Sequence, residues 1–388
     1  MDTTSDSPRE KTSLAEIALA FLKLGTVAFG GPAAHIAMME DEFVRRRHWI
    51  SEAEFLDRIA AASLIPGPSS TEVAIFIGQR KRGWAGLVVG GCCFIIPAAI
   101  LVTLIAAVYA RFGSLPQVAG ILYGIKPAVI AIILQALWKL SQTAIKTKFL
   151  AAVGLLAVVL SAMGATPLLV LAVAGIAGGA WTGIRNRSGL AAVIPVFRHF
   201  GSPLAAGTLA GTIIVAPISL LRLFLSFLKI GSVVFGSGYV LLAFLRSEFI
   251  DHLHWLTEKQ LIDAVAVGQF TPGPVFTTAT FIGYLVAGIP GAFLATVAIF
   301  LPGFLLVACS GPLIPKLRRS PIAAAMLDGV VAGSLALIAV VAWQLGRAAI
   351  VDWRTVLILA ASAAIIFPFR INSAWVIVGA AVAGWLLY

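Results

Sequence analysis

The chain has 388 residues, of which 60% are apolar and 12% are charged, and 28 Lys and Arg residues against 17 Asp and Glu residues give a net charge of +11. Soluble domains are about 45–50% apolar and about 25% charged, so this composition excludes an ordinary soluble enzyme, a disordered chain and a disulfide-rich secreted scaffold. The long, unbroken apolar runs predict an all-α polytopic membrane protein in contact with membrane lipid.

The basic residues lie in short clusters between the apolar runs. Such clusters are typical of cytoplasmic loops in membrane proteins, and they favour that interpretation over nucleic-acid binding. Residues 1–13 are polar and carry both signs of charge, so we expect a short cytoplasmic N-terminal tail. Cys92, Cys93 and Cys309 lie inside apolar runs, where we expect reduced packing residues and no disulfide.

The chain contains an internal duplication. Residues 21–68 align with residues 227–274 at a constant shift of 206, and 18 of these 48 positions are identical. The alignment continues at a shift of 205, where Pro97 meets Pro302. We therefore predict two homologous units joined by a connecting segment; the units cover 14–184 and 220–388, and the segment covers 185–219.

A proline–glycine–proline triplet interrupts each unit. Helical stretches at 53–65 and 69–80 flank Pro66-Gly67-Pro68, and stretches at 258–271 and 275–287 flank Pro272-Gly273-Pro274. Proline cannot continue a helix through its missing N–H, and each stretch is too short to span a membrane. We therefore predict broken, re-entrant helix pairs whose tips meet near the membrane midplane, as at the substrate sites of duplicated transporters.

Longer apolar segments follow the first triplet. Residues 84–110 carry no charge, 118–142 form another candidate span, and Pro167 divides 149–184 into two short helices. These segments are long enough to supply the membrane-spanning part of the unit.

The basic residues are distributed differently in the two units. The first unit has Arg45-Arg46-Arg47 before its hairpin and Arg80-Lys81-Arg82 after it, whereas the equivalent loops of the second unit have neither Lys nor Arg. If basic loops face the cytoplasm, the units face opposite ways and form an inverted repeat. Inversion needs an odd number of crossings, and the charge-free stretch near 203–221 is a candidate for an extra span. We expect a cytoplasmic N-terminus and an exterior C-terminus.

The residues after each triplet are typical of a helix N-terminus, whose free N–H groups and partial positive charge suit an anion. They are Ser69, Ser70 and Thr71 in the first unit and Thr277 in the second. Packed, kinked helices without a ligand are the alternative interpretation. Because the feature occurs twice, we favour an anion site that includes the two triplets.

Lys23 and Lys229 lie inside apolar stretches. An intramembrane charge is a functional hypothesis by default, so we expect these lysines to attract the substrate, unless they snorkel to the interface. A glycine-containing interruption of the helix, here called a break, follows each lysine. The breaks would let the backbone approach a ligand closely or would act as hinges. These breaks contain Phe29, Gly30, Gly31 and Pro32 in the first unit, and Phe235, Gly236 and Ser237 in the second.

The acidic residues include candidates for proton coupling. Four of them form two equivalent pairs, namely Glu42 with Glu248 and Asp57 with Asp263. Helix caps or ion pairs with nearby arginines are their alternative roles. Glu72 occurs only in the first unit, one turn past the triplet, and is the strongest single candidate. The sequence has no nucleotide-binding loop, metal motif or nucleophile motif, so we expect a non-enzyme without cofactor or metal.

The run Phe-Leu-Lys-Leu-Gly-x-x-x-Phe-Gly-Gly-Pro at 21–32, the triplets, the 78–91 stretch and their second copies resemble the chromate ion transporter (CHR) family in its long, two-domain form. The resemblance covers nearly the whole chain. It implies a multi-pass protein of a bacterial-type inner membrane that exports chromate and confers resistance, with sulfate as a mimic. The resemblance also implies that the two lysines, the two breaks and both triplets are site positions, as the matching residues are in the family. Ser237 and Gly238 depart from Gly31 and Pro32.

We expect a secondary transporter that moves a tetrahedral divalent oxyanion by alternating access of the two units. Sulfate or another oxyanion as natural substrate, a passive anion channel, and a membrane enzyme for lipid phosphate are the alternatives. The sequence does not decide whether the protein forms a homodimer, because small-residue runs such as 175–180 pack equally well within one chain or between chains.

Overall fold

The computed structural model describes residues 12–113, 115–185, 218–235, 238–309, 320–369 and 371–388. Within these ranges every regular element is a helix. Five helices are long and apolar enough to cross a membrane, which agrees with the predicted all-helical membrane class. Most of the connecting segment, including 203–217 of the predicted extra span, lies outside the described residues.

The first unit begins with four short elements before its long helices. Ser13 caps the first helix: its hydroxyl oxygen accepts a hydrogen bond from the Glu16 N–H, and the Glu16 carboxylate accepts one from the Ser13 N–H. The elements are α1 (Leu14–Val27), α2 (Gly31–Glu40), the π-helical turn η1 (Asp41–Arg46), α3 (Glu52–Ala62), α4 (Ser69–Phe112), α5 (Pro116–Ala144), α6 (Lys148–Ala162) and α7 (Pro167–Arg185).

The second unit repeats this order. Its elements are α9 (Leu220–Val233), α10 (Leu241–Leu245), the π-helical turn η2 (Arg246–His252), α11 (Glu258–Phe270), the 3₁₀ turn η3 (Val275–Thr277), α12 (Thr278–Cys309), α14 (Pro321–Ala349), α15 (Trp353–Phe369) and α16 (Ser373–Leu387). Helix breaks fall at both triplets and before Pro167, as the sequence predicts. The predicted helix 53–65 ends at Ala62, because residues 63–65 turn toward the triplet.

Helices α4 and α12 each fold back on themselves. Arg82 and Gly83 leave the helical conformation inside α4, and Ala287 and Gly288 do so inside α12. A side chain on Gly78 would collide with the backbone of Gly86, across the bend. Each helix is therefore a short arm and a long arm packed side by side; the arms are 69–81 and 84–112 in α4, and 278–286 and 289–309 in α12.

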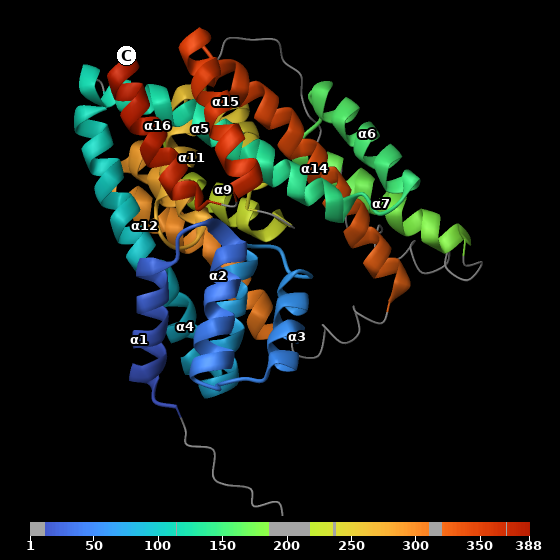
Figure 1. Ribbon diagram of the computed structural model, residues 1–388. Coiled ribbons are helices and arrows are strands. Elements are labelled where there is room, and N and C mark those ends of the chain that lie inside the picture. Colours follow the sequence, from blue (N-terminus) through green and yellow to red (C-terminus); the bar gives the residue numbers. More distant parts are fainter. Residues whose placement is uncertain (1–11, 114, 186–217, 236–237, 310–319, 370) are drawn as a thin grey trace, which may run out of the picture.

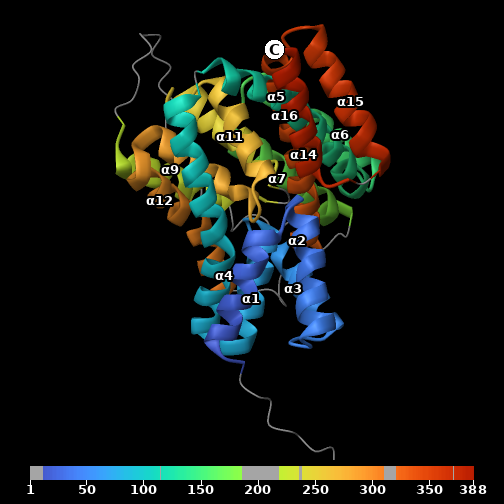
Figure 2. The same cartoon turned by 60° about the vertical axis from the view of Figure 1, so that its left-hand side comes forward.

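Each short arm packs with the preceding helix as a hairpin. We call α3 with the short arm of α4 the first hairpin (52–81), and α11 with the short arm of α12 the second hairpin (258–286). Figures 1 and 2 show α1, α2 and α3 gathered at one end of the molecule, and α9 and α11 in its other half. The two long arms pack against each other between them.

The units exchange their C-terminal helices. The pair α6 and α7 packs on α14 of the second unit, and the pair α15 and α16 packs on α5 of the first unit. Close backbone approach makes these crossings tight, because a Cβ on Gly124 would overlap the Ala380 carbonyl oxygen and one on Gly329 would overlap that of Ala174. Each unit is therefore completed by the other.

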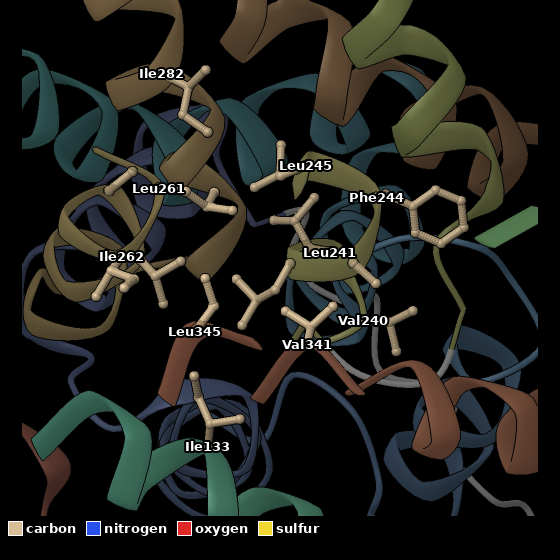
Figure 3. Close-up of a cluster of buried hydrophobic side chains, with 14 of the residues drawn as sticks. Ile133, Val240, Leu241, Phe244, Leu245, Leu261, Ile262, Ile282, Val341 and Leu345 are labelled. Carbon is tan, nitrogen blue, oxygen red and sulfur yellow. The ribbon is translucent and has the colours of Figure 1, made fainter. Parts of the chain in front are cut away.

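The largest buried core lies mainly around the second hairpin. Side chains of α5, α10, α11, α12 and α14 converge there, as Figure 3 shows for Ile133, Leu241, Leu261, Ile282 and Val341. A second core joins α1, η1 and the first hairpin through Phe21, Phe43 and Phe55. The two cores hold the hairpins in fixed places, so that their tips can meet other backbone precisely.

The crossing of α5 and α16 can be tested by a single added methyl group. We expect Gly124→Ala to destabilise the protein by about 1–3 kcal/mol, because its Cβ meets the Ala380 and Gly384 backbone. The measurement is the thermal unfolding midpoint in detergent or nanodiscs.

Gly379→Ala on α16 is the matched control, because nothing lies within 4 Å of its Cβ. It should leave the midpoint unchanged or raise it slightly, since alanine favours helix. Equal midpoints for the two variants would contradict the tight crossing.

Candidate anion site at the hairpin tips

The two triplets form the tips of the hairpins and lie buried in the protein. The Gly67 N–H donates to the Val234 carbonyl oxygen with an N-to-O distance of 2.8 Å, and the Gly273 N–H donates to the Ala28 carbonyl oxygen at 2.9 Å. Ala28 and Val234 occupy equivalent positions immediately after α1 and α9. Each tip is therefore bonded to the break of the other unit.

Both tip glycines have backbone conformations that other residues rarely adopt. Gly67 has φ 137° and Gly273 has φ 90°. A Cβ on Gly273 would lie 2.7 Å from the Ala98 methyl of the long arm of α4, and a Cβ on Gly67 would overlap Oε1 of Glu72. Glycine is required at both tips by conformation, and at Gly273 also by space, whereas a methyl on Gly67 would force the end of the Glu72 side chain to move.

Glu72 occupies a closed position beside the first tip. Its residue is 1% exposed, and neither carboxyl oxygen has a hydrogen-bond partner among the described residues. Thr71 Oγ1 is likewise buried without a partner there. These atoms lie in the first turn of the short arm of α4, where the predicted helix N-terminus is located.

His35 connects the first break to the first hairpin. Its Nε2 lies 3.0 Å from the Ala28 carbonyl oxygen, and its Nδ1 lies 3.2 Å from Ser70 Oγ. A carbonyl only accepts, so Nε2 carries a proton, and in the neutral ring Nδ1 accepts from the Ser70 hydroxyl. Because the Ala28 carbonyl also accepts from the Gly273 N–H, it joins α2 to the second tip, and the His35 ring extends this connection to Ser70 beside the first tip.

The two predicted lysines are paired with glutamates. Nζ of Lys23 lies 3.7 Å from Oε2 of Glu42, and Nζ of Lys229 lies 2.6 Å from Oε2 of Glu248. Both lysine side chains are about half exposed, at 59% and 48%. Their charge is therefore partly offset before any substrate arrives, and their role in substrate attraction stays a prediction.

Glu42 is held by two cations. The Arg47 guanidinium donates to Oε1 at 2.7 Å, and this bond, together with the charge of Lys23, holds the pKa of the carboxyl below its usual range despite partial burial. Glu42 lies outside the five candidate spans. A low pKa favours the ionised form, so the ion-pair interpretation accounts for Glu42 better than proton coupling does.

Asp263 lies at a buried junction between the units. Its Oδ2 accepts a hydrogen bond from the Tyr109 hydroxyl at 2.8 Å, and its Oδ1 lies 3.3 Å from Nζ of Lys126. Tyr109 and Lys126 belong to the first unit, whereas Asp263 belongs to the second hairpin. The equivalent Asp57 lies exposed on α3.

A polar cavity of about 360 Å³ lies away from the tips and includes Arg246, His252 and Gln344 in its wall. The Arg246 guanidinium already donates to Asp251 and Glu258. Two carboxylates offset its positive charge, so this cavity suits a divalent anion poorly.

Most of the remaining predicted residues lie at the starts of helices or in the breaks. Ser69 and Ser70 begin the short arm of α4, Thr277 lies in η3, Phe29 and Phe235 are half-buried, and Gly30 and Gly31 take positive φ at the start of α2. Pro32 follows in α2. Gly236 and Ser237 lie outside the described residues. Groups of three or more metal-ligating side chains are absent from the part of the chain that the structure describes.

The family model that matches is described as chromate transporter, and it matches twice, at residues 15–179 and 221–385. The chain belongs to the chromate transporter family. It is therefore a transporter, not an enzyme, and the resemblance seen in the sequence is confirmed.

Two relatives that match over nearly their full length are named chromate transport protein. The chromate transport protein of Cupriavidus metallidurans is 34% identical over 382 residues, covering 97% of this chain and 94% of its own. That of Pseudomonas aeruginosa is 29% identical over 413 residues, covering 100% and 95%. A Bacillus subtilis protein named uncharacterized transporter YwrA matches 33% of this chain over 72% of its own length, at 27% identity. No solved structure matches at a comparable level of significance.

Sequence reasoning missed Lys126 and Tyr109 as parts of a polar junction. Lys126 lies inside the apolar run 118–142, which also contains Lys139 near its end, and an intramembrane charge is as much a functional hypothesis there as at Lys23 and Lys229. Tyr109 carried no comparable signal.

The Asp263 junction predicts a strong asymmetry between single and double substitutions. Lys126→Met leaves a buried carboxylate without its cation and should cost about 3–5 kcal/mol, whereas Lys126→Met combined with Asp263→Asn should cost clearly less. Thermal unfolding of the single and double variants measures both effects.

Lys146→Met is the control, because the Lys146–Asp328 pair is largely exposed and should contribute less than about 1 kcal/mol. If Lys126→Met destabilised the protein no more than Lys146→Met, the Asp263 junction would contribute no more to stability than an exposed ion pair does.

Proposed function

We propose that this protein exports chromate from the cytoplasm and thereby confers chromate resistance. Membership of the chromate transporter family and full-length relatives named chromate transport protein support the substrate. The observation that carries the mechanism is the reciprocal bonding of each hairpin tip to the break of the other unit. Such a junction changes only when both units move together, as alternating access requires.

The two units form an inverted repeat in this proposal, and the hairpins are re-entrant. The turn at the first triplet returns the short arm of α4 toward the end of the molecule from which α3 enters, where Arg80 pairs with Glu54. The reversal at Arg82–Gly83 then sends the long arm back, and α12 reverses at the equivalent Ala287–Gly288. The first hairpin lies at one end of the molecule, and α9 and α11 lie in its other half (Figures 1 and 2). The tips then meet near the membrane midplane.

The orientation follows from the basic residues of the first unit. Arg45 and Arg46 in η1, and Arg80 beside the bend of α4, belong to the end of the molecule formed by α1–α3. Basic loops face the cytoplasm, so the N-terminus is cytoplasmic and the protein resides in a bacterial-type inner membrane. Exposed apolar side chains of the long arms, such as Trp84, Leu104 and Phe293, face lipid.

Chromate is a divalent tetrahedral anion, and the tips offer it helix N-termini and backbone without direct cations. An inside-negative membrane potential drives two negative charges outward with about 4.6 kcal/mol per 100 mV, at about 2.3 for each charge. Export therefore needs no obligatory coupling ion. Sulfate has the same shape and charge and should compete for the site.

The test is chromate efflux from proteoliposomes that hold the purified protein, with an inside-negative potential and no pH gradient. We expect saturable, potential-driven efflux that sulfate inhibits from the chromate side. Flux that rises linearly with concentration would indicate a channel. Absence of chromate flux under every gradient would overturn the substrate assignment.

Gly67→Ala tests whether the tip belongs to the site. The added methyl overlaps the Glu72 carboxyl at a φ that only glycine adopts easily, so we expect at least about a tenfold loss of flux. Gly164→Ala is the matched control, because Gly164 also has a positive φ but nothing lies within 4 Å of its Cβ. Equal flux in the two variants would remove the first tip from the site.

Lys23→Ala and Lys229→Ala test substrate attraction by the lysines. We expect each to raise KM for chromate with little change in kcat, because a lysine that acts at a distance affects capture more than translocation. Glu42→Gln frees Lys23 from its partner and should lower KM instead. Unchanged KM in both lysine variants would leave the lysines with a structural role only.

A further inference from the structure

The environment of the first tip differs from that of the second tip at one position. The Gly273 tip packs against the Ala98 methyl, and the residue equivalent to Ala98 in the second unit is Gly303. Beside the first tip, the space that a methyl would fill holds the Glu72 carboxyl instead, with Oε1 at 3.7 Å from the Cβ position of Gly303. The first tip thus has a carboxyl where the second has the Ala98 methyl as its nearest neighbour.

The hydroxyl groups show the same difference. Thr277 and Thr278, which follow the second tip, are fully buried, and each hydroxyl donates to a backbone carbonyl oxygen at 2.8 Å. Thr71 and Glu72, which follow the first tip, are buried with no partner among the described residues. Among the described residues that follow the two triplets, those of the first therefore have unused polar capacity, whereas before the second triplet the buried Nε2 of Gln269 also has no partner there.

The position of the carboxyl puts it in competition with an anion. Glu72 lies in the first turn of the short arm of α4, where the helix offers free N–H groups and partial positive charge. An ionised carboxylate there offsets the positive potential that a substrate anion needs and repels the anion. A protonated carboxyl is neutral and has neither effect. We propose that Glu72 is a proton-binding site linked to the anion site, such that oxyanion binding takes up one proton. This inference rests on the proposed function.

The elements packed against α4 carry other titratable or charged groups: Glu16 and Lys23 on α1, His35 and Glu40 on α2, Glu52, Glu54, Asp57 and Arg58 on α3, and Glu258, Lys259 and Asp263 on α11. η3 carries none, and the long arm of α12 carries Cys309 at its exposed end. Lys23, Arg58 and Asp263 are held by Glu42, Glu54 and Lys126 respectively. His35 is the competing candidate, since it bonds Ser70 next to Thr71 and its protonation would also favour an anion.

The measurement is sulfate affinity of the purified protein in nanodiscs as a function of pH, together with proton uptake on binding in weakly buffered solution. Sulfate is the probe because it remains a dianion at weakly acidic, neutral and alkaline pH, whereas chromate itself takes up a proton near neutral pH. For the wild type we expect affinity to fall by up to about tenfold per pH unit, the limit for one linked proton.

Glu72→Gln mimics the protonated carboxyl and should bind sulfate with an affinity that no longer depends on pH and without proton uptake. Glu72→Asp keeps a titrating carboxyl and should retain the dependence, which covers the case of a poorly folded glutamine variant. His35→Gln should retain it too, as should Glu52→Gln, an exposed carboxyl control on the same hairpin.

Three results would overturn the inference: pH-independent sulfate binding by the wild type, unchanged pH dependence in Glu72→Gln, or loss of the dependence in His35→Gln alone. Absence of both sulfate binding and chromate flux in the wild type would instead overturn the proposed function. The two failures are therefore distinguishable.

Discussion

The structure depends on two backbone hydrogen bonds that cross between the units. A proline–glycine–proline tip cannot continue a helix, so its backbone needs a partner from elsewhere, and inside a membrane water does not supply one. Gly67 finds its partner at Val234, and Gly273 finds its partner at Ala28. An unmet buried N–H would cost about 1–3 kcal/mol or more. Each hairpin therefore needs the broken helix of the other unit.

The same dependence extends through the helices that surround the tips. The C-terminal pair of each unit packs on the long helix of the other, and glycines at these crossings bring backbone against backbone. Rigid pairs of this kind transmit movement between units instead of absorbing it. Because the tips lie at the centre of this exchange, a small rearrangement of one unit changes the surroundings of both tips, and a binding site placed there is coupled to the whole molecule.

The local pattern of the sequence predicted the helix breaks, the hairpins and the duplication, because prolines, glycines and apolar periodicity act over a few residues. The meeting of the two tips near the membrane midplane stays a prediction, and the carbonyl groups that hold each tip follow from three-dimensional packing. Contacts between distant residues were out of reach, as at Asp263, whose partners Tyr109 and Lys126 belong to the other unit. The Lys23–Glu42 and Lys229–Glu248 pairs were within reach, since both units keep the same 19-residue spacing.

The duplication makes the two units similar, and the proposed proton-binding site lies where they differ. The first unit has His35 where the second has Leu241, Glu72 where the second has Thr278, and Ala98 where the second has Gly303. The first two differences add polar groups beside the first tip, and the third removes the methyl that would exclude the Glu72 carboxyl. Three independent substitutions thus converge on one point in space. Stability alone does not account for this, because each added polar group raises the cost of burial, so the asymmetry is best explained by chemistry that the first tip performs and the second does not.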